Sequence, residues 1–177
     1  MRSSPKKAWH EWVTTVVAAL ALAIVARSFV LEPFIVDGHS MQNTLANHER
    51  LLVDRLSPEF APLRDGEIVV FQPPLKTRED FVKRIVATGG QTVALSDGGL
   101  YVDGQPVAQP YLLRHGASTR DHCTMSPLRV PQGEIYVLGD NRANSEDSRI
   151  FGPVRLSAVR GVAFFAIWPF SRLGPLR

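Results

Sequence analysis

A serine that could act as a nucleophile lies in the segment Asp37-Gly-His-Ser-Met-Gln-Asn-Thr-Leu45. Gly38, two residues before Ser40, permits a sharp turn that exposes the hydroxyl and the nearby backbone N–H groups. His39 suggests a Ser/His scheme, but neighbouring residues of a strand point to opposite faces, which places His39 badly as a base. Because most serines in such turns only hydrogen-bond the backbone, this segment alone does not establish catalysis.

A lysine occupies the middle of a second apolar run, Phe81-Val-Lys-Arg-Ile-Val-Ala87. Alternation along a strand puts Lys83 on the same face as Phe81 and Ile85, opposite Val82 and Arg84. If that face is inward, desolvation lowers the pKa of the amine, which can then act as a neutral base toward a serine. The alternative is an edge strand whose charge lies in water and prevents aggregation, and the pattern alone favours this alternative.

The segment from Gly139 to Arg149, GDNRANSEDSR, is dense in hydrogen-bonding groups and follows a strand-like run. It is either a turn-rich surface loop or a loop that carries polar groups to a site. In the second case Ser145 could hold the lysine amine, and supporting ion pairs could form among Asp140, Asp147, Arg142 and Arg149.

The chain after Phe34 reads as short β-branched runs broken by Gly, Pro, Asn and Asp, which predicts a mainly β fold, an antiparallel domain with coiled sheets. The expected strands are 50–54, 67–71, 81–86, 92–95, 100–102, 134–138 and 161–167. Turn signals at 97–99 and 103–104 predict a meander from Thr92 to Val107. Residues 112–129 are polar and predict a long surface loop.

The first 31 residues predict a membrane anchor. Residues 12–31 form a 20-residue stretch whose single charge is Arg27, long enough to cross a bilayer as one transmembrane helix. The basic residues before it place the short segment 1–11 in the cytoplasm and the domain 32–177 outside the cytoplasmic membrane. A cleaved secretory signal and a buried soluble helix are the alternatives.

Composition excludes several classes of function. The net charge of +3, with no basic stripe, argues against a nucleic-acid partner. Cys123 is the only cysteine, so no intramolecular disulfide is possible. His115, His122 and Cys123 lack the paired spacing of a metal site, so we expect neither a metal nor a cofactor.

Together, three segments in order resemble those of bacterial type I signal peptidases (leader peptidases). Gly38–Met41 is similar to the family's nucleophile segment, Lys83–Val86 to its lysine segment, and Gly139–Arg149 to its third signature. Further likeness at 64–71, 100–107 and 164–170 extends the resemblance over nearly the whole chain. The ordered set outweighs the edge-strand interpretation of Lys83.

The resemblance implies a Ser/Lys dyad that removes signal peptides from exported preproteins by cutting after small residues. Ser40 would be the nucleophile and, through its backbone N–H, an oxyanion donor; Lys83 would be the base and Ser145 would orient it. Asp147 with Arg149, and Arg84 with Asp140, match supporting pairs. Some relatives have Ser where Gly38 stands, so a second oxyanion donor must be backbone or water. The candidate substrate-pocket residues, for which core packing is an equal alternative, are Phe34, Val36, Met41, Leu45, Phe81 and Val82.

Two other functions stay open on the sequence. A self-cleaving regulator similar to the SOS-repressor proteases would use the same dyad but should carry a DNA-binding helical domain. A membrane-tethered β module that binds a partner through residues 164–170 would not need Ser40 or Lys83. In a peptidase, the same aromatic surface would instead rest on the lipid bilayer, near the substrate.

Overall fold

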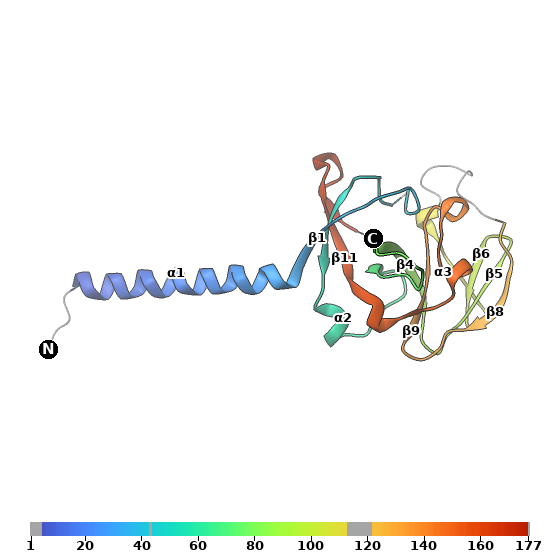
Figure 1. Cartoon of the computed structure of the whole chain (residues 1–177), viewed down its shortest axis with the longest axis horizontal. Helices are drawn as coiled ribbons and strands as arrows, with labels where there is room; N and C mark the ends of the chain where they lie inside the picture. Colours follow the sequence, from blue (N-terminus) through green and yellow to red (C-terminus); the bar gives the residue numbers. More distant parts are fainter. Residues whose placement is uncertain (1–4, 43, 113–121, 177) are drawn as a thin grey trace.

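The computed structural model describes residues 5–42, 44–112 and 122–176. A long helix, α1 (Pro5–Val30), projects from a β domain that contains the rest of these residues (Figure 1). Within the described residues, no helix is both long enough and apolar enough to span a membrane. The prediction of a mainly β antiparallel domain is confirmed.

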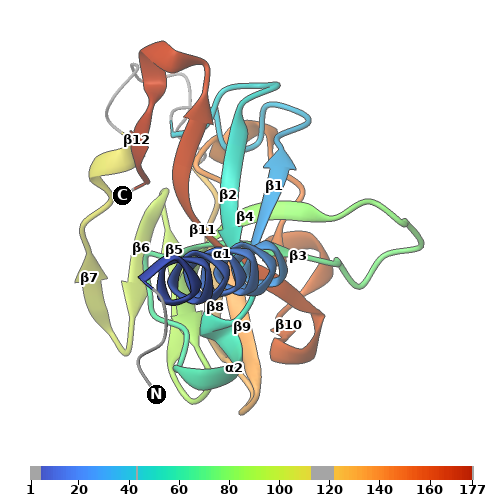
Figure 2. The ribbon, with the colours of Figure 1, turned by 90° about the vertical axis from the view of Figure 1, so that its left-hand side faces the viewer.

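The larger sheet has eight strands in the described residues, and each pair is antiparallel. Their spatial order is β1-β2-β11-β3-β4-β9-β10, with β12 paired to β11, and the sheet curls around the domain (Figure 2). The strands are β1 (Leu31–Ile35), β2 (Arg50–Asp54), β3 (Ile68–Phe71), β4 (Phe81–Thr88), β9 (Glu134–Leu138), β10 (Val154–Arg155), β11 (Val159–Trp168) and β12 (Gly174–Pro175). This order places β1, which leads into the serine segment, at one edge of the sheet.

A second sheet of four strands lies beside the first, in the order β7-β6-β5-β8. Its strands are β5 (Thr92–Ser96), β6 (Gly99–Val102), β7 (Gln105–Val107) and β8 (Met125–Arg129). The predicted meander from Thr92 to Val107 is confirmed as β5, β6 and β7. The predicted loop 112–129 is wrong at its end, because residues 125–129 pair with β5 as a strand; residues 113–121 lie outside the described residues.

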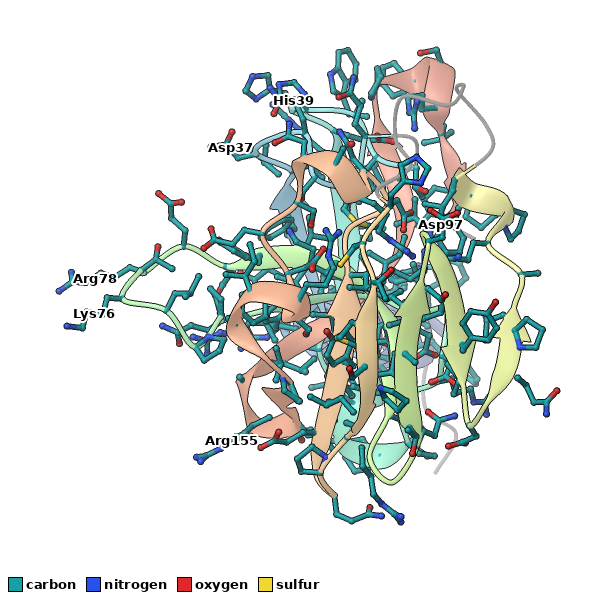
Figure 3. All side chains as sticks on the ribbon, turned by 90° about the vertical axis from the view of Figure 1, so that its right-hand side faces the viewer. Asp37, His39, Lys76, Arg78, Asp97 and Arg155 are labelled. Carbon is teal, nitrogen blue, oxygen red and sulfur yellow. The ribbon has the colours of Figure 1, made fainter. Side chains whose placement is uncertain are left out.

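The connections hold only short helices in the described residues. They are α2 (Ser57–Phe60), α3 (Ser148–Phe151) and the 3₁₀ turns Pro110–Leu112, Arg142–Asn144, Leu156–Ala158 and Phe170–Arg172. The loop between β3 and β4 projects from the domain, and Lys76 and Arg78 lie at its tip (Figure 3).

Strand β4 is buried on both faces, which the sequence alternation did not indicate. Val82 packs in one apolar cluster, Val86 in a second and Ile85 in a third. Arg84, on the face opposite Lys83, is only 2% exposed. The curled sheet and the second sheet cover both sides of the strand, so neither of its faces is exposed to solvent.

Candidate active site

The turn that carries Ser40, residues 37–42, is called the serine turn; it follows β1 and depends on the backbone conformation of Gly38. Gly38 has φ +102°, a region that L side chains rarely adopt, and its N–H donates to Asn47 Oδ1 at 2.9 Å. A serine at this position would therefore be strained, so the missing hydroxyl is consistent with the shape of the turn. The backbone N–H of Ser40 makes no hydrogen bond to a described residue, which leaves it free to donate to a ligand.

Ser40 and Lys83 meet at hydrogen-bonding distance although 43 residues separate them. The Lys83 Nζ lies 2.8 Å from the Ser40 Oγ and 3.1 Å from the Val82 carbonyl oxygen. It also lies 4.8 Å from the centre of the Phe81 ring. The amine thus faces the serine from an apolar wall of β4.

Burial controls the charge of this amine. Lys83 is 4% exposed, and desolvation lowers its pKa from 10.5 to about 8, against the opposing effects of the Asp147 and Glu146 carboxylates. A neutral fraction of this amine is therefore present near neutral pH, as a general base requires.

Asn141 belongs to residues 139–147, the loop after β9, and holds the serine turn in place. Its backbone N–H donates to the Ser40 carbonyl oxygen at 2.9 Å, and its side-chain amide donates to the His39 carbonyl oxygen at 3.1 Å. Sequence reasoning singled out the segment but not this residue. Its amide in a turn-rich run was the available signal, but no pattern distinguished it from Asn144.

Ser145 lies against the end of β9 with a buried hydroxyl. Its Oγ makes no hydrogen bond to any residue that the structure describes. A Cβ atom added at Gly139 would overlap the Ser145 hydroxyl and would lie 2.6 Å from the Ser40 carbonyl oxygen. Only glycine at position 139 lets Ser145 and the serine turn approach the strand this closely.

A buried ion pair fixes β4 to the loop after β9. Arg84 Nε lies 3.0 Å from Asp140 Oδ1 and its Nη2 lies 2.7 Å from Asp140 Oδ2, with both side chains buried. The Thr44 hydroxyl donates to the same carboxylate, and the guanidinium lies over the Tyr111 ring. The pair thus connects the strand of Lys83 with the segment that follows Ser40.

A second ion pair shapes the loop around Ser145. Asp147 caps α3, pairs with Arg149 at 2.8 Å and accepts the Gly139 N–H at 3.0 Å. Arg149 also donates to the carbonyl oxygens of Arg142 and Ser145. The pair and its hydrogen bonds fold the loop back onto the end of β9.

A cleft of about 470 Å³ opens over the Ser40–Lys83 pair. Of the six predicted pocket residues, Phe34, Phe81 and Val82 line it. The other three, Val36, Met41 and Leu45, are at most 2% exposed and pack in the core beneath. They support the floor of the cleft, because Phe34 and Val82, which line it, pack in the same apolar cluster.

No histidine side chain is hydrogen-bonded to Ser40 or Lys83 among the described residues, although His39 lines the cleft. His39 is exposed, and Figure 3 shows it at the outer surface of the turn. His122 pairs with Asp97 on the second sheet, and His115 lies outside the described residues. Among the residues that the structure describes, no group of three His, Cys, Asp or Glu side chains could hold a metal ion.

Comparison with known proteins places this chain in a family. A family model described as signal peptidase, peptidase S26, matches residues 9–168. The chain belongs to this family. The resemblance inferred from the three segments is therefore confirmed, and membership in the signal peptidase family replaces the interpretation as an SOS-type regulator.

Individual signal peptidases match over nearly their whole length. A probable signal peptidase I-1 of Synechocystis sp. is 37% identical over 98% of this chain and 89% of the relative. Signal peptidase I of Bacillus amyloliquefaciens is 33% identical, over 97% and 95%. The crystal structure of a signal peptidase I from Enterococcus faecalis matches with a TM-score of 0.51 and 31% identity, covering 58% of this chain and 97% of that chain.

Proposed function

We propose that this chain is a serine endopeptidase that removes signal peptides from preproteins through Ser40 and Lys83. The single observation that carries the proposal is the 2.8 Å contact between the serine hydroxyl and a buried amine, in a cleft. Family membership and the names of the relatives support the substrate class.

In the proposed reaction, neutral Lys83 accepts the Ser40 proton while the Ser40 Oγ attacks the carbonyl carbon at the scissile bond. The Ser40 N–H donates to the oxyanion that forms. The ammonium of Lys83 then protonates the leaving amine, which departs as the mature protein. Water, deprotonated by the same amine, hydrolyses the acyl-enzyme and restores Ser40. No metal or cofactor takes part.

Ser145, Asp140, Arg84, Asp147 and Arg149 are positioning residues in this proposal. The ion pairs hold β4 and the loop after β9 against the serine turn. The buried Ser145 hydroxyl, which lacks a hydrogen bond to a described residue, is available to orient the amine.

The substrate would bind as an extended strand in the cleft. In the described sheet β1 pairs only with β2, so its other edge is free. Strand β9 pairs with β4 only from Arg84 onward, so the same edge of Phe81–Lys83 is also free of a strand. Two open edges beside the reacting pair suit an added peptide strand. Phe34, Phe81 and Val82 would leave room for small side chains only.

Membrane attachment through residues 12–31 is a further part of the proposal. The segment falls almost entirely within α1, and the side chains at 9–22 are exposed. The segment 1–11 would be cytoplasmic and 32–177 extracytoplasmic, with the exposed Trp168 and Phe170 against the bilayer. Resistance to carbonate extraction, together with protease digestion of 32–177 only from the outer side, would test this topology.

The catalytic proposal is tested by cleavage of a preprotein in detergent. We expect the wild type to cut after a small residue, and Ser40→Ala and Lys83→Ala to be folded but inactive. Ser96→Ala and Lys76→Ala, at exposed positions away from the pair, serve as matched controls. Cleavage by the Ser40→Ala or Lys83→Ala protein would refute the dyad. A wild type that binds a partner but cuts nothing would favour the β binding module.

A further inference from the structure

Acidic side chains line the catalytic cleft beyond the residues that the reaction uses. Asp37 belongs to the serine turn, Glu79 and Asp80 precede β4, and Glu146 follows Ser145 in the loop after β9. Among the described residues of this lining, Lys83 is the only lysine or arginine. Since Lys83 must be neutral to act as a base, the described lysine, arginine and carboxylate side chains of the cleft present only negative charge to a substrate.

Three of these four carboxylates have no partner of opposite charge among the residues that the structure describes. Asp80 lies 3.6 Å from Arg160, whereas Asp37, Glu79 and Glu146 form no ion pair with any residue of the described chain. The basic side chains nearest in sequence to Glu79, Lys76 and Arg78, lie at the tip of the projecting loop and point away from the domain (Figure 3).

The carboxylates differ in their distance from the reacting atoms. Glu146 is close enough to raise the pKa of Lys83, so its charge reaches the residues that flank the scissile bond. Glu79 precedes Lys83 by four residues, or about 13 Å along an extended chain. Its charge therefore faces a substrate residue about four positions away.

We propose that this cleft selects preproteins with Lys or Arg near the cleavage site and discriminates against Asp or Glu there. Glu146 acts on the residues beside the scissile bond, and Glu79 acts farther along the bound strand. A cleft lined by charges of one sign attracts substrate groups of the opposite charge and repels groups of the same charge. The inference rests on the proposed function, because it names the substrates of the same site.

The test uses one fluorogenic peptide with small residues before the cleavage site and the full-length protein in neutral detergent. Lys, Gln or Glu replaces a single residue, either beside the scissile bond or about four residues from it on each side in turn. The measured quantity is the ratio of kcat/KM for the Lys peptide to that for the Glu peptide. This ratio cancels any general change in the reactivity of Lys83 that a variant causes.

For the wild type we expect kcat/KM to fall from Lys to Gln to Glu, by about two- to fivefold at each step, mainly through KM. The ratio should approach one in about 1 M salt, where the Debye length is about 3 Å. Glu146→Lys should reverse the preference beside the scissile bond and Glu79→Lys the preference about four residues away. Glu59→Lys, an exposed position outside the cleft, should change neither.

Equal cleavage of the three peptides by the wild type would overturn the inference and leave the proposed function intact. An equal response to Glu59→Lys would also overturn it, because the overall charge of the protein would then set the preference. If no peptide is cut, binding of the same peptides to Ser40→Ala by fluorescence anisotropy decides. Binding in the order Lys, Gln, Glu supports the charged cleft, and equal binding refutes it.

Discussion

The pH dependence of cleavage should follow the ionisation of Lys83. Burial lowers its pKa to about 8, and only the neutral amine can accept the Ser40 proton. The neutral fraction is about one tenth at one pH unit below the pKa, and about one hundredth at two units below. For a neutral peptide, kcat/KM should therefore rise about tenfold from pH 6 to pH 7 and level off above about pH 9.

The Glu146→Gln variant tests the cause of this profile. The Glu146 carboxylate raises the pKa of Lys83 and so opposes the effect of burial. Removing its charge should move the midpoint of kcat/KM to lower pH, and the movement should shrink at high salt because Glu146 is exposed. Glu59→Gln, outside the cleft, is the matched control and should keep the wild-type midpoint.

The assay is a series of initial rates on a neutral fluorogenic peptide, with circular dichroism recorded at each pH to show that the domain stays folded. A midpoint near the ordinary lysine value of about 10.4 would refute the argument from burial. A midpoint near 8 that shifts equally in both variants would refute the role of Glu146.

Three further variants test the geometry. Lys83→Met should raise the free energy of unfolding at pH 7 by up to about 3 kcal/mol, because the folded state no longer buries an ammonium. In denaturant titrations the gain should shrink between about pH 8 and 10.5, since the buried ammonium destabilises the wild type to the full extent only below the folded pKa of Lys83. A gain in the free energy of unfolding that does not depend on pH would contradict this. Gly139→Ala should lower kcat by about 100-fold, because its methyl group displaces Ser145 and the serine turn; near-normal kcat in a folded protein would contradict the packing. Asn141→Ala should lower kcat by about 10- to 100-fold with KM nearly unchanged, and an effect on KM alone would exclude a role in positioning Ser40.

Local patterns allowed the strands to be predicted well. The β-branched runs at 50–54 and 134–138 became β2 and β9 with the predicted bounds, because alternation and turn residues are local properties. The glycine before the serine was also predicted to permit a sharp turn, and Gly38 indeed has a positive φ. The pairing of 125–129 with β5 was missed, since it depends on a partner more than 25 residues earlier.

The arrangement of the cleft could not be predicted in the same way. Phe34 and Val36 come from one strand-like run, yet one lines the cleft and the other packs in the core. Alternation also failed for β4, whose Val82 and Arg84 are as buried as Lys83. Which side of a strand meets solvent depends on the curl of the sheet and on what packs over it, and neither is a property of a single segment.

The sequence by itself determined the family and the mainly β class and indicated the candidate reacting residues, because ordered motifs and local alternation are written in consecutive residues. The tertiary structure decided that Ser40 and Lys83 meet at 2.8 Å, that Asn141 holds the serine turn and that four carboxylates line the cleft. Ser40 and Lys83 are 43 residues apart in the sequence, and His39 and Asn141 are 102 residues apart. Their distances and their burial, which sets the pKa of Lys83, arise only when the sheet closes around them.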